Sequence, residues 1–263
     1  MQKLYIIKTG STFPSIAQRR GDFEDWALQG MLPALGTGMK AMRTEVVHAE
    51  RPEVEEGGLP IPYPDLASCA GVVVLGSHAM VTDDCAWMHD LQRWLHAVCM
   101  AGIPVLGICF GHQILAQTLG GQVGPHPRGL ELGSVPVSIQ ADVSLDPLWQ
   151  SMPPSFTAHV VHYQTVRQLP PQSVILAGNS HEPHQAFRWR HNVWGVQFHP
   201  EFDEHVMQSY IEHVSQDLAH HGMALLGKDS YCVATPESAQ LLCKFAYHAR
   251  AFARAAKAWQ QAA

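Results

Sequence analysis

One segment, residues 103–121, limits the possible fold more than any other part of the chain. It begins with a short apolar run of Ile, Val and Leu, and such a run predicts a parallel strand that is covered on both faces. Gly107 and Gly111 flank Cys109, so the backbone can turn sharply there, and a helix predicted over residues 110–119 ends at a pair of glycines. A buried strand, a tight turn and a helix in succession predict an α/β fold.

The rest of the first half continues this alternation of strands and helices. Apolar runs that predict strands occupy residues 3–9, 44–49 and 72–75. A long helix is predicted up to Met100, with the side-chain oxygens of the Thr-Asp-Asp run at 82–84 available to cap its first turn. Strands joined by helices pair in parallel, so we expect a doubly wound, mostly parallel central sheet flanked by helices.

Short predicted strands and two further helices fill the second half of the chain. The strands are separated by turn residues and lie at 134–139, 157–161, 174–177, 185–189 and 193–197. This strand-rich half is expected to complete the sheet. One helix is predicted over residues 203–220, and the last begins at Pro236. We therefore expect an α/β domain over residues 1–222 and a C-terminal helical extension over residues 223–263.

The last helix carries an apolar stripe with strict helical spacing. The stripe consists of Leu242, Phe245, Ala249, Phe252, Ala256 and Trp259. The opposite face carries Lys244, Arg250, Arg254 and Lys257. Two interpretations remain open: the stripe packs against the rest of the chain, or it forms a homodimer or docks on another partner.

Composition favours a water-soluble enzyme and excludes several other classes. The 263 residues are 46% hydrophobic and 15% charged, with a net charge of −6, which argues against nucleic acid as a partner. No apolar run is long enough to span a membrane, and the chain begins with a strand rather than a signal peptide. The six cysteines form no Cys-x-x-Cys pair, so disulfides are not expected and the compartment is predicted to be the reducing cytoplasm.

Cys109 is the residue whose position suggests chemistry. A thiol at a helix N-terminus is favoured as the thiolate by the helix dipole and the free N–H groups, although a cysteine at a strand end is otherwise small core filler. The Gly-x-Cys-x-Gly-His-Gln pattern at 107–113 resembles the nucleophile elbow of class I glutamine amidotransferases, in a stand-alone bacterial form related to the glutaminase domain of GMP synthase. The segment His199-Pro-Glu201, which begins 90 residues after Cys109, is similar to the family's His-Pro-Glu segment and follows it in the same chain order.

This resemblance implies three catalytic roles that match the needs of amide hydrolysis. An amide is a poor electrophile with a poor leaving group, so the enzyme must supply a thiolate and a proton for departing ammonia. Cys109 is the predicted nucleophile, and His199 is the predicted base and then acid. Glu201 is expected to orient the imidazole and to stabilise its charged form.

The tetrahedral oxyanion needs hydrogen-bond donors, which backbone N–H groups can supply. One donor is expected from Phe110, directly after the nucleophile, and another from Gly76 or Ser77 at the end of the neighbouring strand. The family commonly has a Gly-Gly pair here, and Ser77 replaces the second glycine. Because serine keeps its N–H, the predicted oxyanion hole is retained.

Three further residues are predicted to contact the substrate. Gln113 resembles the family's glutamine-side residue and is expected at the amino-acid head. Gln164 stands where synthase-type relatives often have the Asp of His-x-Asp, so it offers no negative charge to the substrate ammonium, and weak glutaminase activity without a partner is expected. Arg128, in the loop 124–133 at the predicted rim, is the nearest cation in the sequence for a substrate carboxylate, although an arginine in such a loop is more often a solvated surface residue.

No cofactor or metal site is predicted. The 17 histidines form local clusters, but none has zinc-ligand spacing with a second ligand pair. The sequence also lacks the glycine-rich loops that hold ATP phosphates, and a synthase domain is not expected among the roughly 60 residues after the triad.

Three functions therefore remain open. The first is a glutaminase that hydrolyses glutamine through a thioester and passes ammonia to a separate synthase chain. The second is a hydrolase of γ-glutamyl amides or peptides that uses the same triad. The third is a non-catalytic binding or regulatory relative, against which the intact Cys109, His199 and Glu201 argue.

Overall fold

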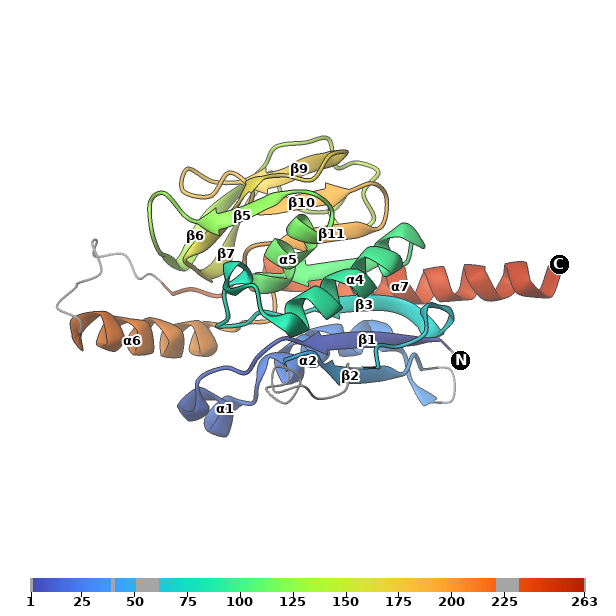
Figure 1. Ribbon diagram of the computed structural model, residues 1–263, viewed down its shortest axis with the longest axis horizontal. Coiled ribbons are helices and arrows are strands. Elements are labelled where there is room, and N and C mark those ends of the chain that lie inside the picture. The colour runs from blue at the N-terminus through green and yellow to red at the C-terminus, as the bar shows by residue number, and fades with distance from the viewer. Residues whose placement is uncertain (1, 39–40, 51–61, 221–231, 263) are drawn as a thin grey trace.

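A mixed nine-stranded sheet forms the centre of the part of the chain that the computed structural model describes, residues 2–38, 41–50, 62–220 and 232–262. Its strand order is β2-β1-β3-β4-β11-β10-β9-β6-β7 (Figure 1). The parallel half consists of β1 (Lys3–Lys8), β2 (Thr44–His48), β3 (Cys69–Val74), β4 (Val105–Ile108) and β11 (Val193–Val196). The antiparallel half consists of β10 (Ala186–Trp189), β9 (Ser173–Gly178), β6 (Glu131–Ile139) and β7 (Ser155–His162).

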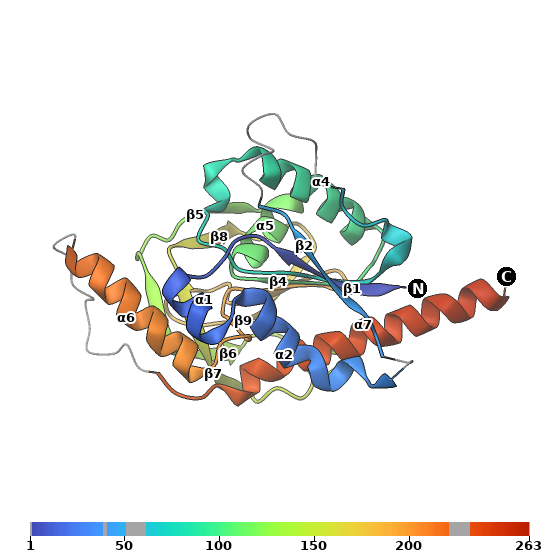
Figure 2. The same cartoon turned by 90° about the horizontal axis from the view of Figure 1, so that it is seen from below.

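Helices cover both faces of the parallel half, which makes the sheet doubly wound (Figure 2). One face carries α4 (Ala86–Met100) and α5 (Phe110–Thr118). The other face carries α1 (Pro14–Arg20), α2 (Phe23–Leu35), α6 (Glu204–His220) and α7 (Pro236–Ala262). Alternate residues of β1 enter the two cores, Leu4 and Ile6 on one side and Tyr5 and Ile7 on the other. The predicted α/β class and central sheet flanked by helices are therefore confirmed.

Several local predictions needed correction. The Thr-Asp-Asp run at 82–84 does not cap the long helix, because Val81–Asp83 forms a separate 3-10 turn and Asp84 adopts a left-handed conformation. The helix begins at Ala86 with Cys85 as its N-cap residue. Two strands and one helix were not predicted: β5 (Gln122–Pro125) and β8 (Gln164–Gln168), which pair with each other, and α1.

The first half of α7 packs closely on the domain. Leu242 packs against Gly30 of α2, and Ala249 packs against Gly71 of β3. Both contacts are so close that a side chain at either glycine position would clash with α7. Leu241, Phe245 and Ala246 are also buried in this core. The second half of α7 extends beyond the body of the molecule toward the C-terminus (Figure 1). The predicted boundary between residues 222 and 223 lies outside the described residues, so the division into two parts stays a prediction.

Within the described residues, no helix is both long and apolar enough to cross a bilayer.

Candidate active site

Three adjacent parallel strands bring the predicted site residues to one edge of the sheet. β4 lies between β3 and β11, and all three point the same way. Gly76 follows β3, Cys109 follows β4 and His199 follows β11. Because the carboxyl ends of parallel strands meet at one edge, residues far apart in sequence converge there.

Cys109 occupies a sharp strand-to-helix turn. It is the N-cap residue of α5 and has φ 50° and ψ −101°, a backbone conformation that residues other than glycine rarely adopt. Gly111 allows the turn, since its N–H donates to Leu75 O at 3.1 Å and a Cβ at this position would lie 2.2 Å from Val74 O. The thiol therefore stands at the end of the strand, with its Sγ 3.8 Å from the carbonyl oxygen of Val161.

His199 and Glu201 form a buried pair beside this thiol. Nδ1 of His199 lies 2.7 Å from Oε1 of Glu201, which leaves Nε2 as the ring nitrogen available for proton exchange. Burial alone would lower the pKa of His199, but the charges of Glu201 and Cys109 outweigh it and raise the pKa to about 10. The imidazole stacks on Phe202 with ring centres 4.1 Å apart, so its plane is fixed.

The predicted oxyanion-hole residues border the same space. A Cβ on Gly76 would lie 3.0 Å from Cε1 of His199 and 3.8 Å from Cβ of Cys109, so the backbone at Gly76 passes directly beside these two side chains. Ser77 and Phe110 both line the cavity, and Phe110 is the first residue of α5, whose N–H has no partner within the helix. The Ser77 hydroxyl accepts a hydrogen bond from Ala79 N at 3.0 Å, which holds the loop in a turn.

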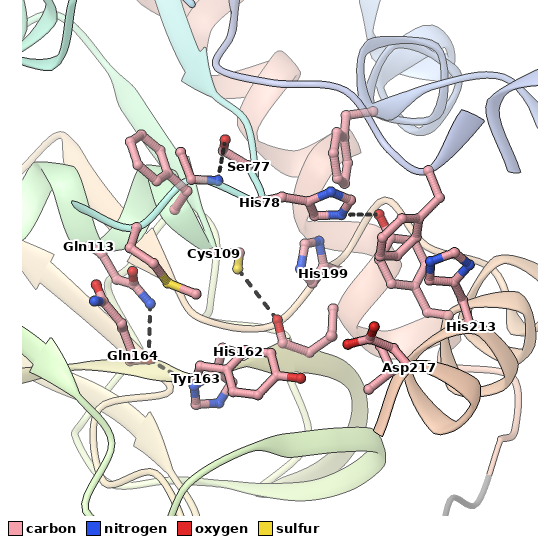
Figure 3. A pocket seen from close by; sticks show the side chains of 18 residues that line it. Ser77, His78, Cys109, Gln113, His162, Tyr163, Gln164, His199, His213 and Asp217 are labelled. Atoms are coloured by element: carbon pink, nitrogen blue, oxygen red, sulfur yellow. Dashed lines mark hydrogen bonds between the residues drawn. The ribbon is translucent and has the colours of Figure 1, made fainter. Parts of the chain in front are cut away.

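Gln113 and Gln164 lie together on one side of Cys109 (Figure 3). Nε2 of Gln113 donates to the carbonyl oxygen of Gln164 at 3.0 Å and to Oε1 of Gln197 at 2.8 Å. The Gln164 side chain donates to Thr82 Oγ1 at 2.5 Å, and its own Oε1 is buried without a hydrogen-bond partner among the described residues.

The structure does not bring Arg128 to this cavity. The side chain is exposed, and its guanidinium donates to the carbonyl oxygen of Ser180. Glu131, from the same predicted rim, is instead buried, with Oε2 2.8 Å from Nε2 of His162 and Oε1 accepting from Asn179. Burial would raise the pKa of Glu131, but these partners lower it, so the carboxylate supports the wall of the cavity from behind.

The cavity around Cys109 has a volume of about 310 Å³ and includes a wall that the sequence did not reveal. This wall, which we call the aromatic arm, consists of Phe13, His78, Tyr210 and His213. Phe13 follows β1, His78 follows the Gly76 loop, and the other two project from α6. No sequence motif connects these segments, so only the fold could reveal that they meet.

Two hydrogen-bonded groups hold the aromatic arm in place. The Tyr210 hydroxyl lies 2.7 Å from Thr12 Oγ1 and 3.3 Å from Nε2 of His78. On the other side of the loop, Asp22 Oδ1 accepts from Thr12 N at 2.8 Å while its Oδ2 lies 2.7 Å from the Lys8 ammonium. The loop that carries Phe13 is therefore anchored to both α6 and the start of α2.

The described residues contain no group of three or more His, Cys, Asp or Glu side chains arranged to hold a metal ion.

Comparison with known proteins adds the family. The chain matches the model for class I glutamine amidotransferases over residues 38–215. A glutamine-hydrolysing GMP synthase subunit from Ignicoccus hospitalis is 33% identical over 158 residues, which cover 58% of this chain and 80% of that protein. Gamma-glutamyl peptidase 5 from Arabidopsis thaliana is 29% identical over 153 residues, which cover 57% of this chain and 61% of that protein.

Solved structures agree on the fold. The glutamine amidotransferase from Methylobacillus flagellatus superposes with a TM-score of 0.65 at 21% identity, covering 96% of this chain and 94% of that one. The chain spans only 23% of the length of a GMP synthase from Thermomicrobium roseum that it also matches. Since the family model matches well over half of its residues, the chain belongs to the class I glutamine amidotransferase family.

Proposed function

We propose that this chain is a cysteine amidohydrolase that cleaves the γ-amide of glutamine or of a related γ-glutamyl compound. The observation that carries the proposal is the buried His199–Glu201 pair at the same sheet edge as Cys109, with Cys109 and His199 both lining one cavity. A strained cysteine at a helix N-terminus next to a buried, charge-stabilised imidazole suits nucleophilic catalysis.

In the proposed reaction, the Cys109 thiolate attacks the γ-carbonyl carbon and forms a tetrahedral intermediate. The N–H groups of Phe110 and of Gly76 or Ser77 stabilise its oxyanion. Protonated His199 then donates to the leaving nitrogen, the C–N bond breaks, and a γ-glutamyl thioester remains on Cys109. His199 next takes a proton from water, the resulting hydroxide attacks the thioester, and glutamate leaves as the thiolate is restored.

The fate of the released amine divides two versions of the proposal. In the first, ammonia passes to an acceptor enzyme on a separate chain, as the similarity to one subunit of a GMP synthase suggests. In the second, the chain hydrolyses a γ-glutamyl amide or peptide and simply releases the product, as the similarity to a γ-glutamyl peptidase suggests. The cavity supports the second version, because it continues past Cys109 along α6 to His213 and Asp217.

Purified protein supplied with glutamine and with several γ-glutamyl amides tests the proposal. We expect glutamate and the corresponding amine in equal amounts, and mass spectrometry of the quenched enzyme should detect a γ-glutamyl adduct on Cys109. The Cys109→Ala variant serves as the control and should form neither product nor adduct. Turnover that persists in this variant would exclude the proposed thioester, and binding without turnover of any substrate would favour the regulatory alternative.

A further inference from the structure

The cavity has two chemically different sides, with Cys109 and His199 between them (Figure 3). Gln113 and Gln164 lie on one side, and His78 and His213 of the aromatic arm lie on the other. The other two members of the arm contact these rings, Phe13 by stacking and Tyr210 through its hydroxyl. We propose that the aromatic arm is a leaving-group subsite and that the substrate is a γ-glutamyl amide whose amine carries an aromatic ring. This inference rests on the proposed function and specifies its substrate class.

The direction of the leaving group follows from the order of the residues across the cavity. Gln113 and Gln164 make this side of the cavity polar, which suits the glutamyl head. His199, which must protonate the leaving nitrogen, lies on the opposite side of Cys109, next to His78 (Figure 3). A group protonated there departs toward the aromatic arm and away from the two glutamines.

The aromatic arm is built from rings that hold one another rigidly. Phe13 stacks on His213 with centres 3.7 Å apart and lies 4.3 Å from the His78 ring. Tyr210 lies 5.3 Å from Phe13 and is fixed through its hydroxyl to Thr12. Because these rings already pack against one another, the protein side chains lose little further conformational freedom when a planar group binds against them.

The charges around the aromatic arm also favour an aromatic leaving group over an acidic one. The residues that line the described cavity include no Lys or Arg, whereas Asp217 lies at the end of the arm. Burial lowers the pKa of His78, and nearby His199 and His213 lower it further, so His78 is neutral at pH 7. The rings of Phe13, His78 and Tyr210 are suited to another aromatic ring, which they can contact in stacked or edge-on geometry.

Two substrates with the same glutamyl part test this inference. γ-Glutamylphenethylamide and γ-glutamylmethylamide release alkylamines of similar basicity, so a difference in kcat/KM reports the environment of the leaving group. We expect the phenethylamide to be preferred by roughly tenfold or more. His213→Ala should reduce this preference several-fold, whereas His213→Phe should retain it. His205→Ala is the matched control, since His205 is exposed on the same helix and does not line the cavity.

The possible outcomes distinguish failure of the leaving-group subsite from failure of the proposed amidohydrolase function. Equal kcat/KM for the two amides in the wild type, or a preference that is the same in the His213→Ala and His205→Ala variants, would overturn the leaving-group subsite. Hydrolysis of glutamine with no cleavage of either amide would also overturn it, while leaving the proposed amidohydrolase intact. If glutamine, the phenethylamide and the methylamide all remain uncleaved, both the leaving-group subsite and the proposed amidohydrolase function are overturned. A thermal melt of each variant establishes that the measured preference belongs to folded protein.

Discussion

Nδ1 of His199 lies 2.7 Å from Oε1 of Glu201, and both residues are almost wholly buried. A buried imidazolium is unfavourable unless a negative charge is near it, so the protonation of His199 depends on Glu201. The pKa of His199 is raised to about 10, because Glu201 and Cys109 together outweigh the opposing effect of burial.

The first prediction concerns this dependence. Glu201→Gln should lower the pKa of His199, because burial is then opposed by one charge fewer, and the imidazole should lose its proton nearer neutral pH. The rate at which iodoacetamide alkylates Cys109, followed from pH 5 to pH 10, should therefore fall at neutral pH in the variant. His199→Ala should slow acylation by substrate more severely than Glu201→Gln, and the reverse order would mean that the two roles are exchanged.

The second prediction concerns selectivity among the thiols. Burial raises the pKa of Cys69 to about 11 and that of Cys99 to about 12, and it also raises the pKa of Cys232 and Cys243. Cys109, at a helix N-terminus, should therefore react first when native protein meets a small excess of iodoacetamide. Peptide mapping after short exposure measures this order. Similar labelling of all six cysteines in folded protein, including Cys85 at the N-terminus of α4, would refute an activated thiolate.

The third prediction concerns the backbone at Cys109. Its φ of 50° and ψ of −101° are strained for a residue with a Cβ, and such strain amounts to about 1–3 kcal/mol. Cys109→Gly relieves the strain, whereas Cys109→Ala retains it. Glycine also increases the entropy of the unfolded chain, which offsets roughly 0.4–1 kcal/mol of this gain. Urea unfolding should therefore find the inactive glycine variant more stable than the inactive alanine variant, and the opposite order would show that the turn is not strained.

The fourth prediction concerns the anchor of the Phe13 loop. Burial would raise the pKa of Asp22, but Lys8 and the N–H groups of Thr12 and Phe23 lower it below its usual 3.8. The stability from this carboxylate is therefore present above pH 3.8 and is lost as the pH falls through the folded value. Asp22→Asn keeps an oxygen that can cap α2 but removes the charge that pairs with Lys8, so it should destabilise the protein by about 1 kcal/mol at pH 7. The difference in unfolding free energy should shrink in acid, and a difference that does not vary with pH would contradict this assignment.

The fifth prediction concerns the glutamyl side of the cavity. Gln164→Asp introduces a carboxylate where the substrate ammonium is expected, and Gln164→Asn changes the length of the side chain equally without adding charge. A hydrogen-bonded charge contact contributes about 1.5–3 kcal/mol, so KM for glutamine should be at least roughly tenfold lower for the Asp variant than for the Asn variant. Equal KM values would place the ammonium elsewhere.

The sequence predicted those parts of the molecule that local patterns encode. The continuous apolar run before Cys109 specifies a buried strand, and the helical spacing of the apolar stripe specifies α7. The order of strands and helices along the chain then brings Cys109 and His199 to one edge of a parallel sheet. β5 and β8 were missed because both are short: Gln122–Pro125 contains Gly and Pro, which disfavour strands, and Gln164–Gln168 is mostly polar without alternation. The signal for α1 was present, since Pro14 suits the first turn of a helix and Gly21 its end.

The aromatic arm could not be predicted from any such pattern. Phe13 and His213 stack with ring centres 3.7 Å apart, although 200 residues separate them in the chain. Their contact depends on how α6 crosses the loop after β1, and nothing local in either segment encodes that crossing. The choice between a substrate contact and a solvated surface position for Arg128 could not be made from the sequence for the same reason, because nearness to the predicted rim says little about which way a loop side chain faces.

The position of β11 has a consequence for how the protein is made. β11 is inserted between β4 and β10, and its Val196 accepts the backbone hydrogen bond of Cys109 at 2.9 Å. During synthesis from the N-terminus, the cysteine leaves the ribosome long before the strand that delivers His199 and Glu201. A growing chain therefore carries this cysteine without the two residues that the proposed mechanism requires. Under that proposal, the three residues come together only after β11 has entered the sheet, so hydrolysis cannot begin before this strand has been made.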